Sequence, residues 1–270
     1  MTTRLAHSPA RAHRSWRHAV WGALLGLAVA TVVWAPARWL AWGVAQASQG
    51  QVQLLDPRHS VWTGSAQLVL SGGSGSRNPQ ALPGRLSWQI QPTWAGLRLV
   101  WQAECCMPQA ASLQVQAGLS TLTLQINDHR SQWPAALLTG LGAPWNTLQA
   151  EGQLLLHTEA LQLHWSQGRM QMRGQAQLDV QQLSSRLSTL KPMGSYRLQL
   201  AGTPEGTATP SLQLSTLQGP LLMSGQGQWV GQRLRFTGEA SAQEGHEAAL
   251  SNLLNIMGRR QGSRSLLSLG

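Results

Sequence analysis

The sequence predicts a mainly β protein, in which an N-terminal transmembrane helix precedes a long curved, mostly antiparallel sheet with one or two short helices. Apolar and polar residues alternate with a period of two in many short runs, which is typical of strands that bury one face. Glycine, proline and serine separate these runs roughly every ten residues, which favours a meander. One apolar stretch without charged residues lies near the N-terminus.

The uncharged stretch covers residues 19–35, with four arginines before it and Arg38 shortly after it. Such a helix can cross a hydrocarbon core about 30 Å thick. Basic residues ahead of the span predict a cytoplasmic N-terminus. We therefore expect a cytoplasmic Arg-rich head over 1–18, a transmembrane anchor over 19–37 and a periplasmic β-rich domain over 38–270, placed at the inner membrane of a bacterium. The anchor positions are Ala19, Trp21, Leu24, Leu25, Leu27, Val29, Val32, Val33 and Trp34.

A cleaved signal peptide is the alternative interpretation of this N-terminal segment. Its cleavage site would be the small-residue motif Ala45-Gln46-Ala47. The apolar run is longer than the usual core of a signal peptide, which is about 7–15 residues. Trp34 and Trp39 suit anchoring at a membrane interface. In both interpretations the bulk of the chain is exported from the cytoplasm.

The strand-like runs continue through the whole exported part. Their apolar positions are mainly Leu, Trp and Val, and the alternate positions are Gln, Ser, Thr and Arg, which suits an antiparallel sheet with one wetted face. Gly64 and Gly174 each open a similar run, and glycine at such a position marks a bend or bulge. The runs lie at 86–90, 97–101, 113–115, 122–126, 161–165, 176–180, 196–200, 212–214 and 234–236.

Helical spacing is rare after the N-terminal stretch. Short helices are expected over 134–139 and 183–190, and the clearest helix over 246–257. In the last segment Leu250, Leu253, Leu254 and Met257 recur at the spacing of one helix face. A final strand is expected over 266–269.

Composition and motifs exclude several function classes. The net charge is +10, but the basic residues are dispersed and do not form the cluster with stacking aromatics that nucleic-acid binding needs. Phosphate-loop, zinc-protease and nucleophile-elbow motifs are missing from the sequence. His157 and His164 are seven residues apart, so on one regular strand they would face opposite sides. We therefore predict no enzyme, no catalytic or metal site, no cofactor and no nucleic-acid partner.

Cys105 and Cys106 are the two cysteines of the chain, and they are adjacent. They can form a vicinal disulfide in an oxidising compartment, remain free thiols, or bridge to another chain. Two thiols are too few for a zinc site, which needs about four ligands.

Four segments resemble protein N of the type II (general) secretion pathway. They follow an Arg-rich head, one span and the segment 36–40, and are residues 50–55, 60–66, 82–88 and 253–262. The most specific is the V-W-x-G-x-A pattern that contains Trp62, Gly64 and Ala66. The resemblance implies a bitopic inner-membrane protein with a periplasmic body, accessory to the machine that moves folded proteins through the outer membrane. It brings no catalytic residues. The matching positions, Trp88 included, are interpreted as sheet-building.

Two functional hypotheses follow. In the first, the chain is a non-catalytic secretion component that contacts other type II secretion proteins, with exposed sheet edges pairing with partner strands. In the second, it is a periplasmic lipid- or amphiphile-binding protein of the envelope, because a curved sheet with an apolar face can pack on acyl chains.

Overall fold

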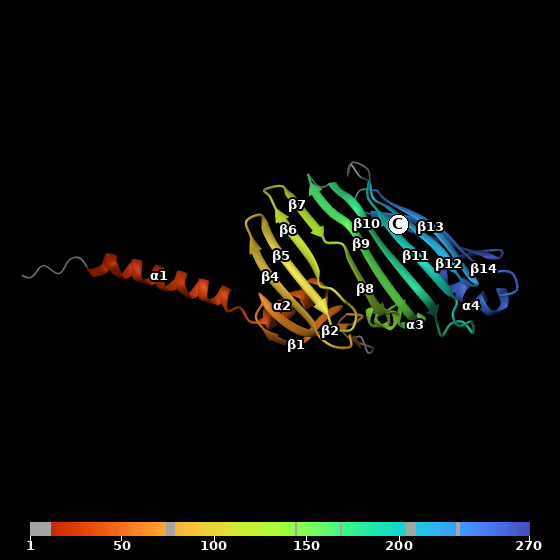
Figure 1. Cartoon of the computed structure of the whole chain (residues 1–270), viewed down its shortest axis with the longest axis horizontal. Coiled ribbons are helices and arrows are strands. Elements are labelled where there is room, and N and C mark those ends of the chain that lie inside the picture. The colour runs from red at the N-terminus through yellow and green to blue at the C-terminus, as the bar shows by residue number, and fades with distance from the viewer. Residues whose placement is uncertain (1–11, 74–78, 144, 168, 204–208, 231–232) are drawn as a thin grey trace, which may run out of the picture.

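The computed structural model describes residues 12–73, 79–143, 145–167, 169–203, 209–230 and 233–270. An N-terminal helix, α1 (Ala12–Val33), projects away from a body that is dominated by one 16-stranded sheet (Figure 1). All pairings within this sheet are antiparallel, and helices are few in the described residues. The prediction of a mainly β protein with a large antiparallel sheet is confirmed.

The N-terminal helix differs from the predicted anchor over 19–37. It begins at Ala12 and ends at Val33, and a second helix, α2 (Ala37–Ala47), follows Pro36. The break has a local cause, because proline disfavours helical backbone in the residue before it. The uncharged part of α1 is therefore residues 19–33, shorter than the about 20 residues that a spanning helix needs. Among the described residues, no helix has the length and apolarity required to cross a membrane.

The strands follow the order β1-β2-β4-β5-β6-β7-β9-β10-β11-β12-β13-β14-β16-β15. Two short strands lie off this path, since β3 pairs with β2 and β8 pairs with β9. Their bounds are β1 (Val52–His59), β2 (Thr63–Leu70), β3 (Gln80–Ala81), β4 (Leu86–Thr93), β5 (Gly96–Ala103), β6 (Ala111–Ala117), β7 (Thr121–Ile126), β8 (His129–Pro134), β9 (Glu151–Ser166), β10 (Arg169–Ser184), β11 (Gly194–Ala201), β12 (Ser211–Gln218), β13 (Leu221–Val230), β14 (Arg233–Ala242), β15 (Arg259–Gln261) and β16 (Arg264–Leu269).

The register gathers the apolar positions of these strands on one face. Trp88 lies opposite Trp101, Leu124 lies opposite Leu163, and Leu163 lies opposite Met172. Directly opposed residues in antiparallel strands share a face, so these pairs form rows of apolar side chains across the sheet. The alternation seen in the sequence thus produces one apolar and one polar face.

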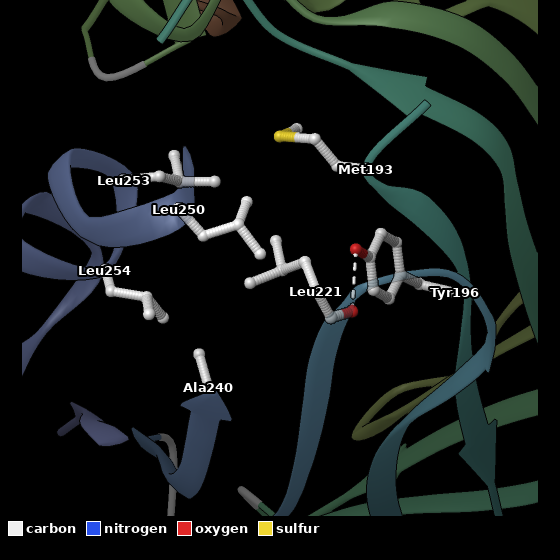
Figure 2. Packing of buried hydrophobic residues seen from close by; sticks show 7 residues of the cluster. All are labelled: Met193, Tyr196, Leu221, Ala240, Leu250, Leu253 and Leu254. Carbon is white, nitrogen blue, oxygen red and sulfur yellow. Dashed lines mark hydrogen bonds between the residues drawn. The ribbon is translucent and has the colours of Figure 1, made fainter. Parts of the chain in front are cut away.

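Helices cover this apolar face near the lower ends of the strands in Figure 1. The covering elements are α2, the 3-10 helix η1 (Ala135–Leu141), α3 (Trp145–Leu148) and α4 (Glu247–Met257). Figure 2 shows α4 packed on the sheet, where Tyr196 donates a hydrogen bond of 3.0 Å from its hydroxyl to the carbonyl of Leu221. The buried residues there are Met193, Tyr196, Leu221, Ala240, Leu250, Leu253 and Leu254.

The helix expected over 183–190 is wrong. Residues 183 and 184 end β10, and a turn segment follows them. The hydroxyl of Ser185 accepts from the amide of Leu187, and that of Ser188 accepts from the amide of Leu190. Such local bonds give the backbone an alternative to the helix. The other two helix predictions correspond to η1 and α4, with bounds shifted by one or two residues.

Candidate functional site

The motif residues around Gly64 join the first strands of the sheet. The indole ring of Trp88 is buried and donates a hydrogen bond of 2.9 Å to the carbonyl of Val61. The same ring lies over Gly64, where an added Cβ atom would stand 2.5 Å from the Cζ2 atom of Trp88. Ala66, two residues further on the same face, is fully buried in the cluster beneath α2. A side chain at position 64 would therefore collide with the ring of Trp88.

Trp62 connects the sheet to the N-terminal helices. Its indole nitrogen donates a hydrogen bond of 2.8 Å to the carbonyl of Val32, near the end of α1. Next to it, the amide of Val61 donates to the carbonyl of Ala35 over 2.8 Å. The last carbonyls of a helix have no partner inside the helix, so Trp62 supplies the carbonyl of Val32 with a donor from outside α1. The motif therefore fixes where α1 leaves the body.

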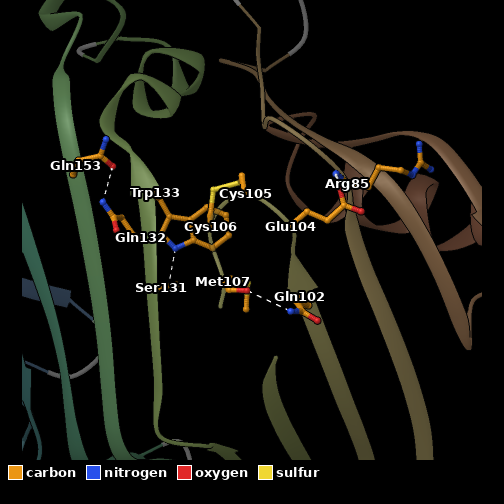
Figure 3. The surroundings of a disulfide bond; sticks show 10 residues. All are labelled: Arg85, Gln102, Glu104, Cys105, Cys106, Met107, Ser131, Gln132, Trp133 and Gln153. Carbon is orange, nitrogen blue, oxygen red and sulfur yellow. Dashed lines mark hydrogen bonds between the residues drawn. A yellow bond between two sulfur atoms is a disulfide. The ribbon is translucent and has the colours of Figure 1, made fainter. Parts of the chain in front are cut away.

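The disulfide lies in the turn between β5 and β6 (Figure 3). Cys105 and Cys106 are bonded to each other, with their Cα atoms 3.7 Å apart. Cys105 is exposed, whereas Cys106 is buried in a cluster against which Trp133 of β8 packs. The carbonyl of Cys106 accepts a hydrogen bond of 2.8 Å from the amide of Gln132. The sequence left three states open for these cysteines, and the structure contains the intrachain disulfide.

A cleft in two parts lies along β8. Its larger part has a volume of about 650 Å³ and its smaller part about 410 Å³, and Pro108, Arg130 and His157 line both. The cleft is within the size range of ligand sites, which is about 300–1,000 Å³. The remaining lining residues are Gln109, Asp128, His129, Ser131, Gln132, Leu155, Leu156, Glu159, Gln177 and Asp179.

The carboxylates of the cleft already have partners. Asp179 accepts two hydrogen bonds of 2.8 Å from the guanidinium of Arg197, which holds the pKa of Asp179 below its ordinary value. Glu159 accepts from the side-chain amide of Gln175. Asp128 accepts from a backbone amide in the bulge of β9. Each of these three side chains therefore already accepts a hydrogen bond from another part of the chain.

His129 also lines the cleft and is 7% exposed. Within the described part of the chain, neither of its ring nitrogens has a hydrogen-bond partner. Burial lowers the pKa of His129, because the charged imidazolium loses solvation. Buried polar groups normally have hydrogen-bond partners, so two buried ring nitrogens without one are unusual.

The expectation that His157 and His164 face opposite sides is wrong. His157 lies opposite Gln177 and His164 lies opposite Gln171, two positions on the same face of β10. Between them β9 carries an extra residue at a bulge, where Ala160 has a φ of +46°. One inserted residue reverses the alternation. In the sequence, the apolar positions shift phase between 154–158 and 161–165 at the same place.

The structure keeps the predicted residues in three separate places: the exposed helix α1, the motif around Trp88, and the disulfide turn. The cleft was missed by sequence reasoning, because Arg130, His157 and Asp179 come from three strands with no shared local pattern. Among the described residues, no group of three or more His, Cys, Asp or Glu could hold a metal ion.

These features define a β-sheet scaffold with a helical N-terminal extension. The family model for type II secretion system protein N matches residues 50–266, which include most of the sheet. The chain therefore belongs to the type II secretion system protein N family, and the resemblance seen in the sequence is confirmed. Family membership identifies a type II secretion component and implies interaction with other type II secretion proteins. No curated protein and no solved structure matches the chain.

Proposed function

We propose that the chain is an accessory, non-catalytic component of the type II secretion apparatus that acts through protein contacts in the periplasm during export of folded proteins across the outer membrane. The family match over residues 50–266 carries this proposal, because it extends from β1 to β16. The match therefore includes most of the sheet and not one local motif.

The proposed location is the inner membrane, with residues 1–18 cytoplasmic, 19–37 associated with the membrane and 38–270 periplasmic. The exposed apolar surface of α1 supports this arrangement, since Trp21, Leu25 and Leu27 are 66–70% exposed. Exposed apolar patches of this kind mark interaction with a membrane or a protein. In the sequence, Arg14 and Arg17 precede the uncharged stretch, and basic residues ahead of a span favour a cytoplasmic flank.

A deletion strain tests the secretion role. We expect folded exoproteins to accumulate in the periplasm, and the wild-type gene to restore their release into the medium. Unchanged release from the deletion strain would overturn the proposed function.

Substitutions on α1 test the membrane association. The double change L25D and L27D places two charges on the exposed apolar surface and should move the chain from the membrane fraction to the soluble fraction. The matched control is I256D, because Ile256 is 61% exposed on α4, a helix of the body. Membrane association that survives the α1 changes would contradict the proposed location.

Amphiphile binding is the second candidate function. One observation favours it: Leu97 and Leu122, near the starts of β5 and β7, lie on the apolar face and are 45% and 36% exposed. The covering helices lie near the lower ends of the strands (Figure 1). An uncovered apolar face can pack on acyl chains. Mass spectrometry of the purified full chain should then detect co-purified lipid. Lipid-free protein, together with unchanged outer-membrane permeability in the deletion strain, would remove this candidate.

A further inference from the structure

Four exposed tryptophan side chains lie around the point where α1 leaves the body. Trp34 directly follows α1, Trp39 and Trp42 belong to α2, and Trp94 lies in the turn between β4 and β5. Trp34 and Trp42 are 76% and 68% exposed, and Trp94 is fully exposed. Tryptophan normally buries most of its large apolar ring, so exposed rings gathered in one region mark an interaction surface. We call these four residues the tryptophan surface.

Two hydrogen bonds place the turn between β4 and β5 close to the end of α1. The indole of Trp62 donates to the carbonyl of Val32 in α1, and the carbonyl of Trp62 accepts a bond of 2.6 Å from the amide of Ile90 in β4. Trp94 is four residues beyond Ile90, which is about 14 Å along an extended chain. In Figure 1 this turn lies at the upper left of the body, on the side from which α1 projects.

Helix α2 brings two further rings to the same region. It begins at Ala37, four residues after Val33, the last residue of α1. The residues of α2 that pack on the sheet are Leu40, Ala41 and Val44. Trp39 and Trp42 are exposed, so they lie on the part of α2 that the sheet leaves uncovered. The tryptophan surface thus combines a helix and a hairpin turn on either side of the exit of α1.

The charge around the tryptophan surface is positive. Arg38 on α2 and Arg98 on β5 are exposed, and neither forms an ion pair within the described chain. Residues 34–48 and 92–98 contain no aspartate or glutamate. A guanidinium can form two parallel hydrogen bonds with a phosphate, and tryptophan is enriched at the headgroup level of membranes. This combination therefore suits a phospholipid interface.

We propose that the body docks on the bilayer that holds α1, with the tryptophan surface at the level of the lipid headgroups and Arg38 and Arg98 on the phosphates. The inference rests on the proposed membrane association of α1. Continuity with the exposed apolar surface of α1 favours lipid over a partner protein as the occupant. Because α2 and the β4–β5 turn are separate parts of one rigid sheet assembly, contact at both fixes the angle between the sheet and the membrane.

A fluorescent label beside Trp94 tests the proposal in the full chain. The exposed Ala95 is replaced in A95C and labelled with a nitrobenzoxadiazole group, and the native cysteines do not react because they are bonded to each other. The chain is reconstituted into vesicles of phosphatidylcholine and phosphatidylglycerol, with or without lipid that carries a doxyl quencher near the headgroup. The quencher should lower the emission to about half, because the label then lies at headgroup level.

The matched control is S263C, labelled in the same way. Ser263 is exposed in the turn between β15 and β16, at the opposite end of the strand order from β1, so its emission should not respond to the quencher. A label at position 95 that stays unquenched on a vesicle-bound chain would overturn the proposal. Emission that shifts to shorter wavelength without quenching would identify a protein surface, such as a second copy, as the occupant, and would overturn the lipid assignment.

The double variant W39Q and W42Q tests whether α2 and the turn dock together. It should remove most of the quenching of the label at position 95, because the rings of α2 no longer hold the body on the bilayer. The control is W145Q, since Trp145 is an exposed tryptophan of α3 outside the tryptophan surface. Both proteins should keep the wild-type circular-dichroism spectrum. Full quenching in the double variant would contradict a shared surface.

The vesicle and secretion assays separate this inference from the proposed function. Quenching at position 95 with unchanged export in the deletion strain supports the docking and overturns the secretion role. A vesicle-bound chain without quenching, together with a secretion defect in the deletion strain, supports the role and overturns the docking. A chain that does not bind the vesicles overturns both the docking and the proposed membrane location.

Discussion

The substitution Gly64→Ala provides the sharpest test of the packing around the family motif. A Cβ atom at this position would stand 2.5 Å from Cζ2 of Trp88, and 2.8 Å from each of the carbonyl oxygens of Arg58 and Ser60. Real Cβ atoms essentially never approach heavy atoms this closely. The two oxygens belong to backbone and cannot move aside as the end of a side chain does.

The expected cost follows from these contacts. A buried methyl group in free space would contribute about 0.8 kcal/mol of stabilisation. Forcing extra volume into a packed site costs about 1–3 kcal/mol, and backbone contacts place this site at the upper end of that range. The net expectation is a decrease of about 2 kcal/mol in the free energy of unfolding. The ring of Trp88 must also move, so its fluorescence should change.

Urea unfolding of the full chain, followed by tryptophan fluorescence, measures this decrease. The matched control is Gly43→Ala in α2, where an added Cβ meets nothing within 4 Å. The free energy of unfolding of that variant should be about 0.5–1 kcal/mol higher than that of the wild type, because alanine favours a helix more than glycine does. If the free energy of unfolding of Gly64→Ala lies within about 0.5 kcal/mol of the wild-type value, the close approach of Trp88 to Gly64 is refuted.

Three further predictions concern the rest of the sheet. Tyr196→Phe removes the hydroxyl that donates to Leu221, so the free energy of unfolding in urea should fall by about 1 kcal/mol, and an unchanged value would contradict the role of this bond. Asp179→Asn should lower the free energy of unfolding by about 1.5 kcal/mol at neutral pH. Arg197 holds the pKa of Asp179 in the folded protein below its ordinary value. The ion pair therefore stabilises the fold at pH values above that ordinary pKa, and this stabilisation is lost as the pH falls through the folded pKa. The difference in free energy of unfolding between this variant and the wild type should therefore become smaller in acid, and a difference that stays constant with pH would disprove the ion pair's contribution. Gly174→Ala should destabilise the β9–β10 hairpin by more than about 1 kcal/mol, since Gly174 has a φ of +75° and its Cβ would meet the carbonyl of Ala160. Wild-type hydrogen-exchange protection in that hairpin would show that the bulge tolerates a side chain.

The period-two alternation was enough to predict the mainly β fold, because burying one face of a sheet requires an apolar residue at every second position. The helix near the C-terminus was equally visible, since Leu250, Leu253 and Leu254 recur at helical spacing and are all buried in the structure. The helix expected over 183–190 failed because two serine side chains bond to the local backbone. Spacing alone does not reveal that competition.

The N-terminal stretch shows a similar division. Its apolar composition and its arginines were plain in the sequence, but the bounds of α1 depend on the break before Pro36 and on the bonds that Val32 and Ala35 accept from Trp62 and Val61. Those donors come from the turn between β1 and β2. The residue at which α1 ends is therefore set by contacts that form only when the chain folds.

The sequence by itself determined the class of fold, the family and the adjacency of Cys105 and Cys106, because each of these is written in neighbouring residues. Only the tertiary structure decided that β8 shares one side of β9 with β7. Arg130 and His157 meet through that pairing, although 27 residues separate them in the chain. Strand pairing between distant segments is set by the packing of whole faces and by turn geometry, and no local pattern records it.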